Sequence, residues 1–197
     1  RGQHQPTWTY MLGTTETRIG TSGIYAFPGG VPVTGASLLG SAVEPDQVTL
    51  SFPWFSVPGA LLGQRFDQFP GSPAIADGRY IVYKGNYTDL ADGLGRTGIY
   101  FRDVLTPVLV PYTGLIASSN TLIPNQPAGG TTKFGSTAPP SAANGLVYFT
   151  GLDIEAAPTL GGIYRAPIAS TPPLQVIASI GGQVPGEPPG VGFRTMG

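Results

Sequence analysis

The sequence predicts an all-β protein of short strands and many turns, and three observations lead to this prediction. The chain of 197 residues contains 30 glycines and 21 prolines, and both residue types interrupt helices. No capped stretch of about ten residues has apolar side chains at the spacing of a helix face. The hydrophobic fraction of 41%, with nine tyrosines and nine phenylalanines, is large enough to form a core. We therefore expect a single all-β domain covering residues 1–197.

The composition excludes several classes of function. There is no cysteine and only one histidine, His4, so disulfides, thiolate zinc sites and sites that need two histidines are ruled out. We expect His4 to be a surface side chain in a junction strand. The 10 basic residues do not exceed the 11 acidic ones, which is against nucleic-acid binding. No run of about 18 apolar residues is present, so we expect no membrane span.

A Gly-Ile-Tyr tripeptide occurs three times and is the centre of a longer recurring pattern. Each copy follows an aromatic-rich segment that ends in glycine and precedes an aliphatic-proline corner and then a phenylalanine. The segments are Trp8–Gly13, Tyr80–Gly85 and Leu146–Gly151; the tripeptides begin at Gly23, Gly98 and Gly162; the corners are Val57-Pro58, Ile123-Pro124 and Val184-Pro185; and the phenylalanines are Phe66, Phe134 and Phe193. This order predicts three units, residues 8–78, 79–145 and 146–197, the last together with 1–7.

Each unit is expected to contain four short strands, with turns at Asp77-Gly78 and Asn144-Gly145 leading into the next aromatic strand. The first strand is aromatic, the second begins at Gly-Ile-Tyr, the third is aliphatic and the fourth lies near the phenylalanine. The expected third strands are Val48–Phe52, Val108–Tyr112 and Leu174–Ile177. The first unit has an extra segment, Thr34–Gln47, before its third strand.

The two ends of the chain together match one complete junction between units. Twelve residues separate Phe134 from Leu146, and the four residues after Phe193 plus the eight up to Trp8 make the same number. The first strand therefore completes the last unit, either in the same chain, which closes a ring, or in a neighbouring chain, which gives a head-to-tail polymer. A third alternative is that the units belong to a longer array. The residues expected in this strand are Trp8, Thr9, Tyr10, Met11 and Leu12.

The order of these motifs resembles the blades of secreted bacterial propeller-like tandem-repeat proteins, many of which carry a C-terminal sorting anchor. The resemblance implies β-propeller-like blades and an extracellular or cell-surface location. Closed propellers have about four to eight blades, so a ring completed by two chains, a three-fold β-prism or trefoil-like barrel, and a linear stack are the alternatives. The scarcity of lysine and the start at Arg1 also favour a secreted, processed protein.

Oxygen ligands gather in the second unit, where Asn86, Asp89 and Asp92 offer a candidate calcium site. The simpler interpretation is a solvated hairpin tip in which Asn, Asp and Gly form turns, and no other cofactor is expected. Asn86-Tyr87-Thr88 is also a glycosylation sequon in a predicted loop. Trp54 and Phe55 form either part of the core or an exposed contact patch.

Three functions are compatible with these features. We expect a secreted, non-enzymatic structural or surface protein that associates with itself through strand edges. The first alternative is a carbohydrate-binding module, although the repeated Tyr25, Tyr100 and Tyr164 favour a core over sugar stacking. The second alternative is a glycoside hydrolase, which needs two facing carboxylates. The candidate carboxylates are Asp77, Asp89, Asp103 and Asp153.

Overall fold

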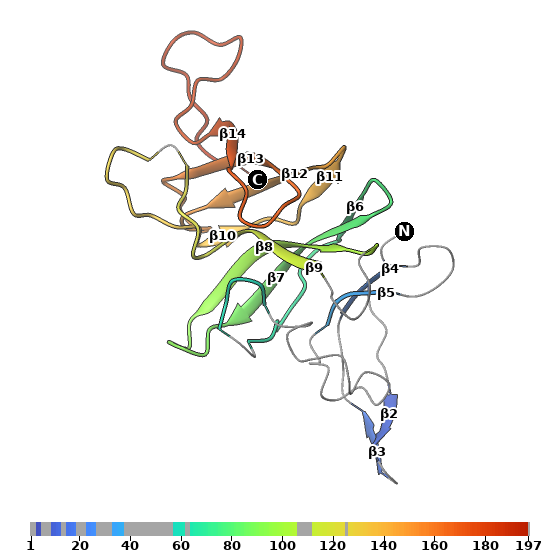
Figure 1. Cartoon of the computed structure of the whole chain (residues 1–197). Coiled ribbons are helices and arrows are strands. Elements are labelled where there is room, and N and C mark those ends of the chain that lie inside the picture. Colours follow the sequence, from blue (N-terminus) through green and yellow to red (C-terminus); the bar gives the residue numbers. More distant parts are fainter. Residues whose placement is uncertain are drawn as a thin grey trace.

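The computed structural model describes residues 3–4, 9–12, 15–18, 23–26, 33–37, 57–61, 64–105, 112–124 and 126–196 (Figure 1). Every regular element in these residues is a β-strand, so the all-β prediction is confirmed. None of them forms a helix that is long and apolar enough to cross a membrane. The strands are β1 (Gln3–His4), β2 (Thr9–Leu12), β3 (Thr15–Arg18), β4 (Gly23–Ala26), β5 (Val33–Ser37), β6 (Ala74–Ala76), β7 (Tyr80–Thr88), β8 (Gly95–Asp103), β9 (Tyr112–Ser118), β10 (Ser136–Thr137), β11 (Ser141–Ala143), β12 (Leu146–Leu152), β13 (Gly161–Pro167) and β14 (Gln175–Ser179).

The strands form three main antiparallel sheets and one separate hairpin. The first sheet has the order β1-β4-β5, and the middle sheet has the order β6-β7-β8-β9. The last sheet has the order β10-β12-β13-β14, with β11 also paired to β12. The middle and last sheets lie one above the other in Figure 1, where the first sheet lies beside the middle one. The described strands form no closed barrel.

The Gly-Ile-Tyr tripeptide has the same pairing in all three sheets. Each glycine lies opposite a serine, each isoleucine lies opposite an alanine, and the register shifts between the isoleucine and the tyrosine. The glycine–serine pairs are Gly23 with Ser37, Gly98 with Ser118, and Gly162 with Ser179. A β-bulge therefore recurs at one position of the motif, where it bends the strand and increases its twist.

The third strand of each sheet contains an Ala-Ser pair. In the first and middle sheets this strand does not lie where the third strand was expected. In the first sheet this strand is β5, within the segment Thr34–Gln47 that was expected to be an insertion. In the middle sheet β9 begins at Tyr112, where the expected strand ended. In the last sheet β14 overlaps the expected strand Leu174–Ile177. The other expected strand, Val48–Phe52, lies outside the described residues.

The N-terminal strand differs from the expectation. The strand that pairs with β4 is β1, in which His4 lies opposite Ile24, just as Lys84 lies opposite Ile99 and Thr150 opposite Ile163. Of the expected strand, Thr9–Leu12 is β2 and forms a hairpin with β3, while Trp8 lies outside the described residues. In the described residues this strand therefore pairs with β3 and not with the last sheet of the same chain, and its pairing with a neighbouring chain stays a prediction.

Two aromatic cores lie on opposite faces of the middle sheet. Side chains alternate between the faces of a strand, so β7 directs Ile81 and Tyr83 to one core and Val82 to the other. The first core joins the middle sheet to Ile24 of the first sheet and to Val57 and Phe66. The second core joins it to the last sheet. Its members from the last sheet and the preceding loop are Ile123, Phe134, Val147, Phe149, Tyr164 and Ala166.

The two cores contain the same arrangement of three rings. Phe66 packs edge-on against Tyr100 with ring centroids 4.9 Å apart, and Phe134 packs edge-on against Tyr164 at 5.3 Å. Tyr83 completes the first group and Phe149 completes the second. Each phenylalanine ring lies against a glycine of the neighbouring strand, where a Cβ would collide with the ring; these glycines are Gly85 and Gly151.

Two hairpin turns, one within the middle sheet and one within the last sheet, contact each other. Asp77-Gly78 and Asn144-Gly145 all have positive φ angles, between 51° and 70°, as expected for a tight Asp-Gly or Asn-Gly hairpin turn. The carboxylate of Asp77 accepts hydrogen bonds from the backbone N–H groups of Asn144 at 3.1 Å and Gly145 at 2.7 Å. The first turn therefore holds the second one in place.

Candidate functional site

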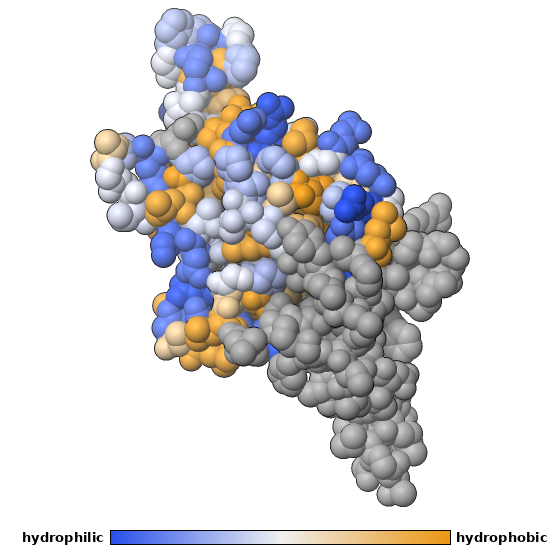
Figure 2. All heavy atoms as spheres, viewed as in Figure 1, coloured by the Kyte–Doolittle hydropathy of each residue, from blue (hydrophilic) through white to orange (hydrophobic). Residues whose placement is uncertain are grey.

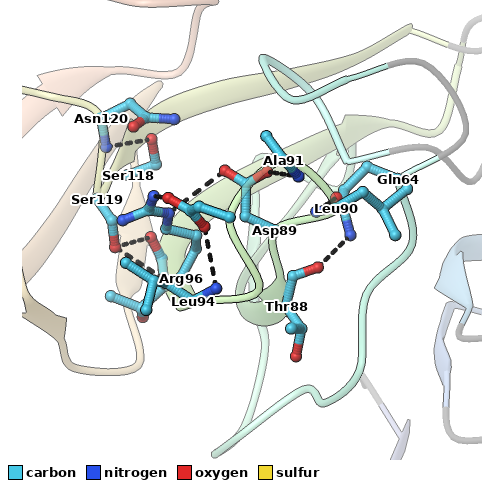
Figure 3. A network of polar contacts seen from close by, with 12 residues as sticks. Gln64, Thr88, Asp89, Leu90, Ala91, Leu94, Arg96, Ser118, Ser119 and Asn120 are labelled. Carbon is cyan, nitrogen blue, oxygen red and sulfur yellow. Dashed lines mark hydrogen bonds and ion pairs between the residues drawn. The ribbon is translucent and has the colours of Figure 1, made fainter.

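The loop between β7 and β8 uses its carboxylates to form turns. Asp89 accepts a hydrogen bond from the backbone N–H of Ala91, and Asp92 accepts one from Leu94. The remaining oxygens of both acids face the guanidinium group of Arg96, which forms ion pairs with Asp92 and, at 3.4 Å, with Asp89 (Figure 3). The loop is further held by Gln64, which accepts a hydrogen bond from the backbone N–H of Leu90.

These contacts bear on the candidate calcium site. Arg96 places a positive charge on the carboxylate oxygens that a calcium ion would need, which favours the turn interpretation of Asp89 and Asp92. Asn86 lies within β7 rather than in a loop, so that part of the prediction is wrong. Among the described residues no three His, Cys, Asp or Glu side chains are placed to hold a metal ion together.

A polar cleft of about 280 Å³ lies between the middle and last sheets. Lys84 and Arg96 line it from the middle sheet, and Glu155 lines it from the loop after β12. Burial lowers the pKa of Lys84, while the charge of Glu155 opposes this shift. Two further pairs hold the rim: Thr88 Oγ1 donates to Asp67 at 2.8 Å, and Ser136 Oγ donates to Glu155 at 3.1 Å. The cleft can therefore offer both charges and hydroxyl groups to a small polar ligand.

The carboxylates proposed for hydrolysis have structural partners. Asp103 has a side chain that is 3% exposed and accepts a bidentate interaction from Arg79, with Nη2 to Oδ2 at 2.6 Å. The hydrogen bonds from Arg79 hold the pKa of Asp103 below its usual value. Burial raises the pKa of Asp153, but hydrogen bonds from Thr159 and neighbouring backbone N–H groups outweigh this and lower it. Each acid therefore stabilises a turn or a strand end of its own.

Two of the three repeated tyrosines, Tyr100 and Tyr164, lie in the cores. Tyr100 is fully buried, its hydroxyl accepts and donates no hydrogen bond among the described residues, and burial raises its pKa well above the usual value. Burial also raises the pKa of Tyr164 to about 12. Neither ring is available to stack on a sugar. Trp54 and Phe55 lie outside the described residues, and so does the side chain of Tyr25.

The outer face of the last sheet, which the sequence patterns did not single out, carries Ile163 and Ile177 beside the polar residues Thr150, Arg165 and Gln175. It corresponds position by position to the face of the middle sheet that the last sheet covers. Ile116 of β9 is 1% exposed, whereas its counterpart Ile177 of β14 is 52% exposed. Ile99 is fully buried, whereas Ile163 is partly exposed. An alignment on the Ala-Ser pairs Ala117-Ser118 and Ala178-Ser179 would have matched these positions from the sequence alone.

The chain after β14 lies beside this face and projects from it. Figure 1 shows it as the dark red loop beyond the last sheet, and Figure 2 shows apolar atoms at its base. In this tail, residues 180–196, Val184 and Phe193 hold the positions of Ile123 and Phe134. Phe134 is 1% exposed, whereas Phe193 is partly exposed.

No known protein-family model matches this sequence, and no curated protein and no solved structure shows detectable similarity to it.

Proposed function

We propose that this chain is a secreted, non-enzymatic structural or surface protein. On this proposal it is built from repeated four-stranded units that pack face to face, and it associates with itself head to tail. The observation that carries the proposal is the pair of equivalent aromatic cores, in which Phe66 with Tyr83 and Tyr100 matches Phe134 with Phe149 and Tyr164. A chain that uses one interface twice can use it again with another unit of the same kind.

The arrangement of the sheets supports blades stacked in series, as the resemblance to propeller-like tandem-repeat proteins implies. Each of the middle and last sheets begins with an outer strand that follows a phenylalanine, continues with an aromatic strand and a Gly-Ile-Tyr strand, and ends with an Ala-Ser strand. The contact between units is thus made by sheet faces and by the loop that carries the phenylalanine. Strand edges contribute where that loop continues into the outer strand of the next sheet.

Self-association is tested by light scattering coupled to size-exclusion chromatography over a range of protein concentrations. We expect a mass that rises with concentration, and negative-stain images that show rings or filaments of regular repeat. A protein that remains monomeric at every concentration, with no effect of dilution on its stability, would contradict the proposal.

The polar cleft supports a second candidate function, the binding of a carbohydrate. Its mixture of Lys84, Asp67 and Glu155 offers the donors and acceptors that sugar hydroxyls use. A glycan array tests this idea, with Lys84→Ala as the variant and Lys133→Ala, which lies outside the cleft, as its control. Binding that Lys84→Ala abolishes and Lys133→Ala preserves would favour the lectin function, whereas the absence of any bound glycan would leave the structural function alone.

A further inference from the structure

We infer that the outer face of the last sheet, together with the tail, binds the first sheet of a second copy of this chain. This inference rests on the proposed function and adds to it the two surfaces that meet. Within one chain, the middle sheet and the loop 119–135 pack against the last sheet. In the same way, the outer face and the tail of one copy would pack against the first sheet of the next copy.

The tail is already folded as the contact loop of the other units. In the earlier loop, the backbone N–H of Val57 donates to Gln64 at 2.9 Å, and Phe66 follows two residues later. In the tail, Val184 donates to Val191 at 2.9 Å, and Phe193 follows two residues later. Both loops turn at a glycine with positive φ, Gly59 at 78° and Gly186 at 83°. The loop shape is therefore present before any partner binds.

The loops differ in what covers them. The phenylalanine and valine of the earlier loop, Phe66 and Val57, are 3% and 2% exposed. In the tail Phe193 and Val184 are partly exposed, and Val191 is 43% exposed. Within the chain, the equivalent face and loop are covered twice by the following sheet, first by the middle sheet and then by the last sheet. The tail and the outer face of the last sheet are the third such surface, and their apolar side chains are exposed. A second copy of this chain offers a surface that matches them, which is its first sheet.

The first sheet is the matching half. Among the described residues its outer strand is β1, whereas the middle and last sheets have a further strand outside the aromatic one: β6 in the middle sheet, and β10 with β11 in the last. Of these further strands, β6 begins eight residues after Phe66 and β10 begins two residues after Phe134. Phe193 is followed by Arg194–Met196, which pairs with no described strand. Residues 194–196 are the counterpart of the residues that lead from Phe134 into β10, so they can add a strand beside β1 of the second copy.

The register supports this occupant. Tyr25 holds the position of Tyr100 and Tyr164 next to the bulge, the position against which Phe66 and Phe134 pack. Thr137, three residues after Phe134, lies opposite Gly151. By the same register Met196, three residues after Phe193, lies next to the end of β1 of the second copy.

The outer face also has polar positions, which include Thr150, Arg165 and Gln175. Arg165 stands where the middle sheet has Phe101, and its Nε donates to the side chain of Gln175 at 2.7 Å. Arginine is enriched at protein interfaces because its long stem packs while its guanidinium stays hydrogen-bonded. This residue also keeps the uncovered face soluble, so the contact can form and dissociate instead of aggregating.

The first test compares two variants that place the same charge at equally exposed isoleucines of the last unit. Ile177→Asp lies on the outer face, and Ile154→Asp, at a site 56% exposed in the loop after β12, is the matched control. Sedimentation velocity over a concentration series should show that Ile177→Asp weakens self-association by about tenfold or more. Ile154→Asp should associate like the wild type, and both variants should melt like it when dilute.

The second test identifies the partner surface. The chain has no cysteine, so His4→Cys and Met196→Cys each introduce a single thiol. A short bismaleimide should cross-link a mixture of the two variants into a dimer joined between the introduced thiols, while Lys133→Cys mixed with Met196→Cys should give none.

The outcomes separate the two levels of the proposal. If the wild type assembles but Ile177→Asp assembles equally well and His4→Cys does not cross-link to Met196→Cys, this inference is wrong and the proposed function stands. If the wild type never assembles, both are wrong.

Discussion

The middle sheet and the last sheet share their strand order, their bulge and their three-ring groups, yet only the middle sheet is covered on both faces. The face that holds Ile99 and Ile116 is part of a core in the middle sheet, and the face that holds Ile163 and Ile177 is open in the last one. The comparison shows that the same strand pattern can end in a core or in a surface. What decides between them is the presence of a following sheet.

The difference is also visible in the residues that each face carries. Phe101 is fully buried in the middle sheet, whereas Arg165 stands at the same position of the last sheet. A terminal repeat commonly carries a more polar outer face, which keeps the end of an array soluble. The last sheet has Arg165, Gln175 and Thr150 beside Ile163 and Ile177 on this face, so it combines the features of an end with those of a contact surface.

The comparison predicts its largest effect for the two equivalent phenylalanines. Phe134→Ala removes a buried ring that contacts Phe149 and Tyr164, and should lower the free energy of unfolding by about 3–5 kcal/mol. Phe193→Ala removes a partly exposed ring and should cost about 1 kcal/mol or less in dilute protein. Urea denaturation at low concentration measures both. Equal losses would mean that the tail is covered within the monomer.

A smaller effect is predicted for the glycines beneath the phenylalanine rings. A Cβ at position 151 would lie 2.5 Å from Cε1 of Phe134, so Gly151→Ala should lower stability by about 1–3 kcal/mol through overpacking. Gly85→Ala should cause a similar loss, because Phe66 lies against it in the same way. Gly95→Ala is the control, since a Cβ there meets nothing within 4 Å. If thermal melting showed no loss of stability for Gly151→Ala, the two ring groups would not be equivalent.

The acid dependence of stability should include a contribution from the middle sheet that the last sheet lacks at the equivalent position. Asp103 pairs with Arg79 at the end of β8, whereas the corresponding position of β13 is Pro167. The hydrogen bonds from Arg79 lower the pKa of Asp103, so its contribution is present above the ordinary carboxyl pKa and is lost as the pH falls through the lowered value. Asp103→Asn should therefore differ from the wild type most at neutral pH, and the difference should shrink in acid.

Unfolding followed at several pH values measures this difference. The control is Glu187→Gln, which changes an exposed carboxylate of the tail. A constant gap between Asp103→Asn and the wild type from neutral to acid pH would show that the ion pair contributes nothing to the pH dependence.

The fold class and the strands around the repeated motifs could be predicted because their signals are local. Glycine, proline and aromatic alternation mark the segments that became β7, β8, β12 and β13, and Asp77-Gly78 and Asn144-Gly145 mark their turns. The third strands were harder, because Leu115–Ser118 and Thr34–Ser37 contain small residues that resemble a loop. Gly98 is a glycine because a Cβ there would lie 2.9 Å from the carbonyl oxygen of Ala117, a contact between β8 and β9 that the local sequence does not reveal.

The candidate site was less predictable. Pairing of β1 with β4 depends on two residues, Gln3 and His4, which carry no strand pattern of their own, so the aromatic Trp8–Leu12 segment was preferred. The outer face of the last sheet could not be recognised from the sequence, because Ile177 and Ile116 have the same local pattern. Only the arrangement of the sheets shows that one is buried and the other exposed.

Hydrogen–deuterium exchange of the wild-type chain, compared between dilute and concentrated solutions, tests the central claim most directly. If the outer face and the tail bind the first sheet of another copy, the backbone amides of residues 194–196 and of β1 should become protected together as the concentration rises. Those of the loop 89–94, which lies away from both surfaces, should not change. Exchange that is independent of concentration in the tail and in β1, under conditions where the protein assembles, would contradict the account.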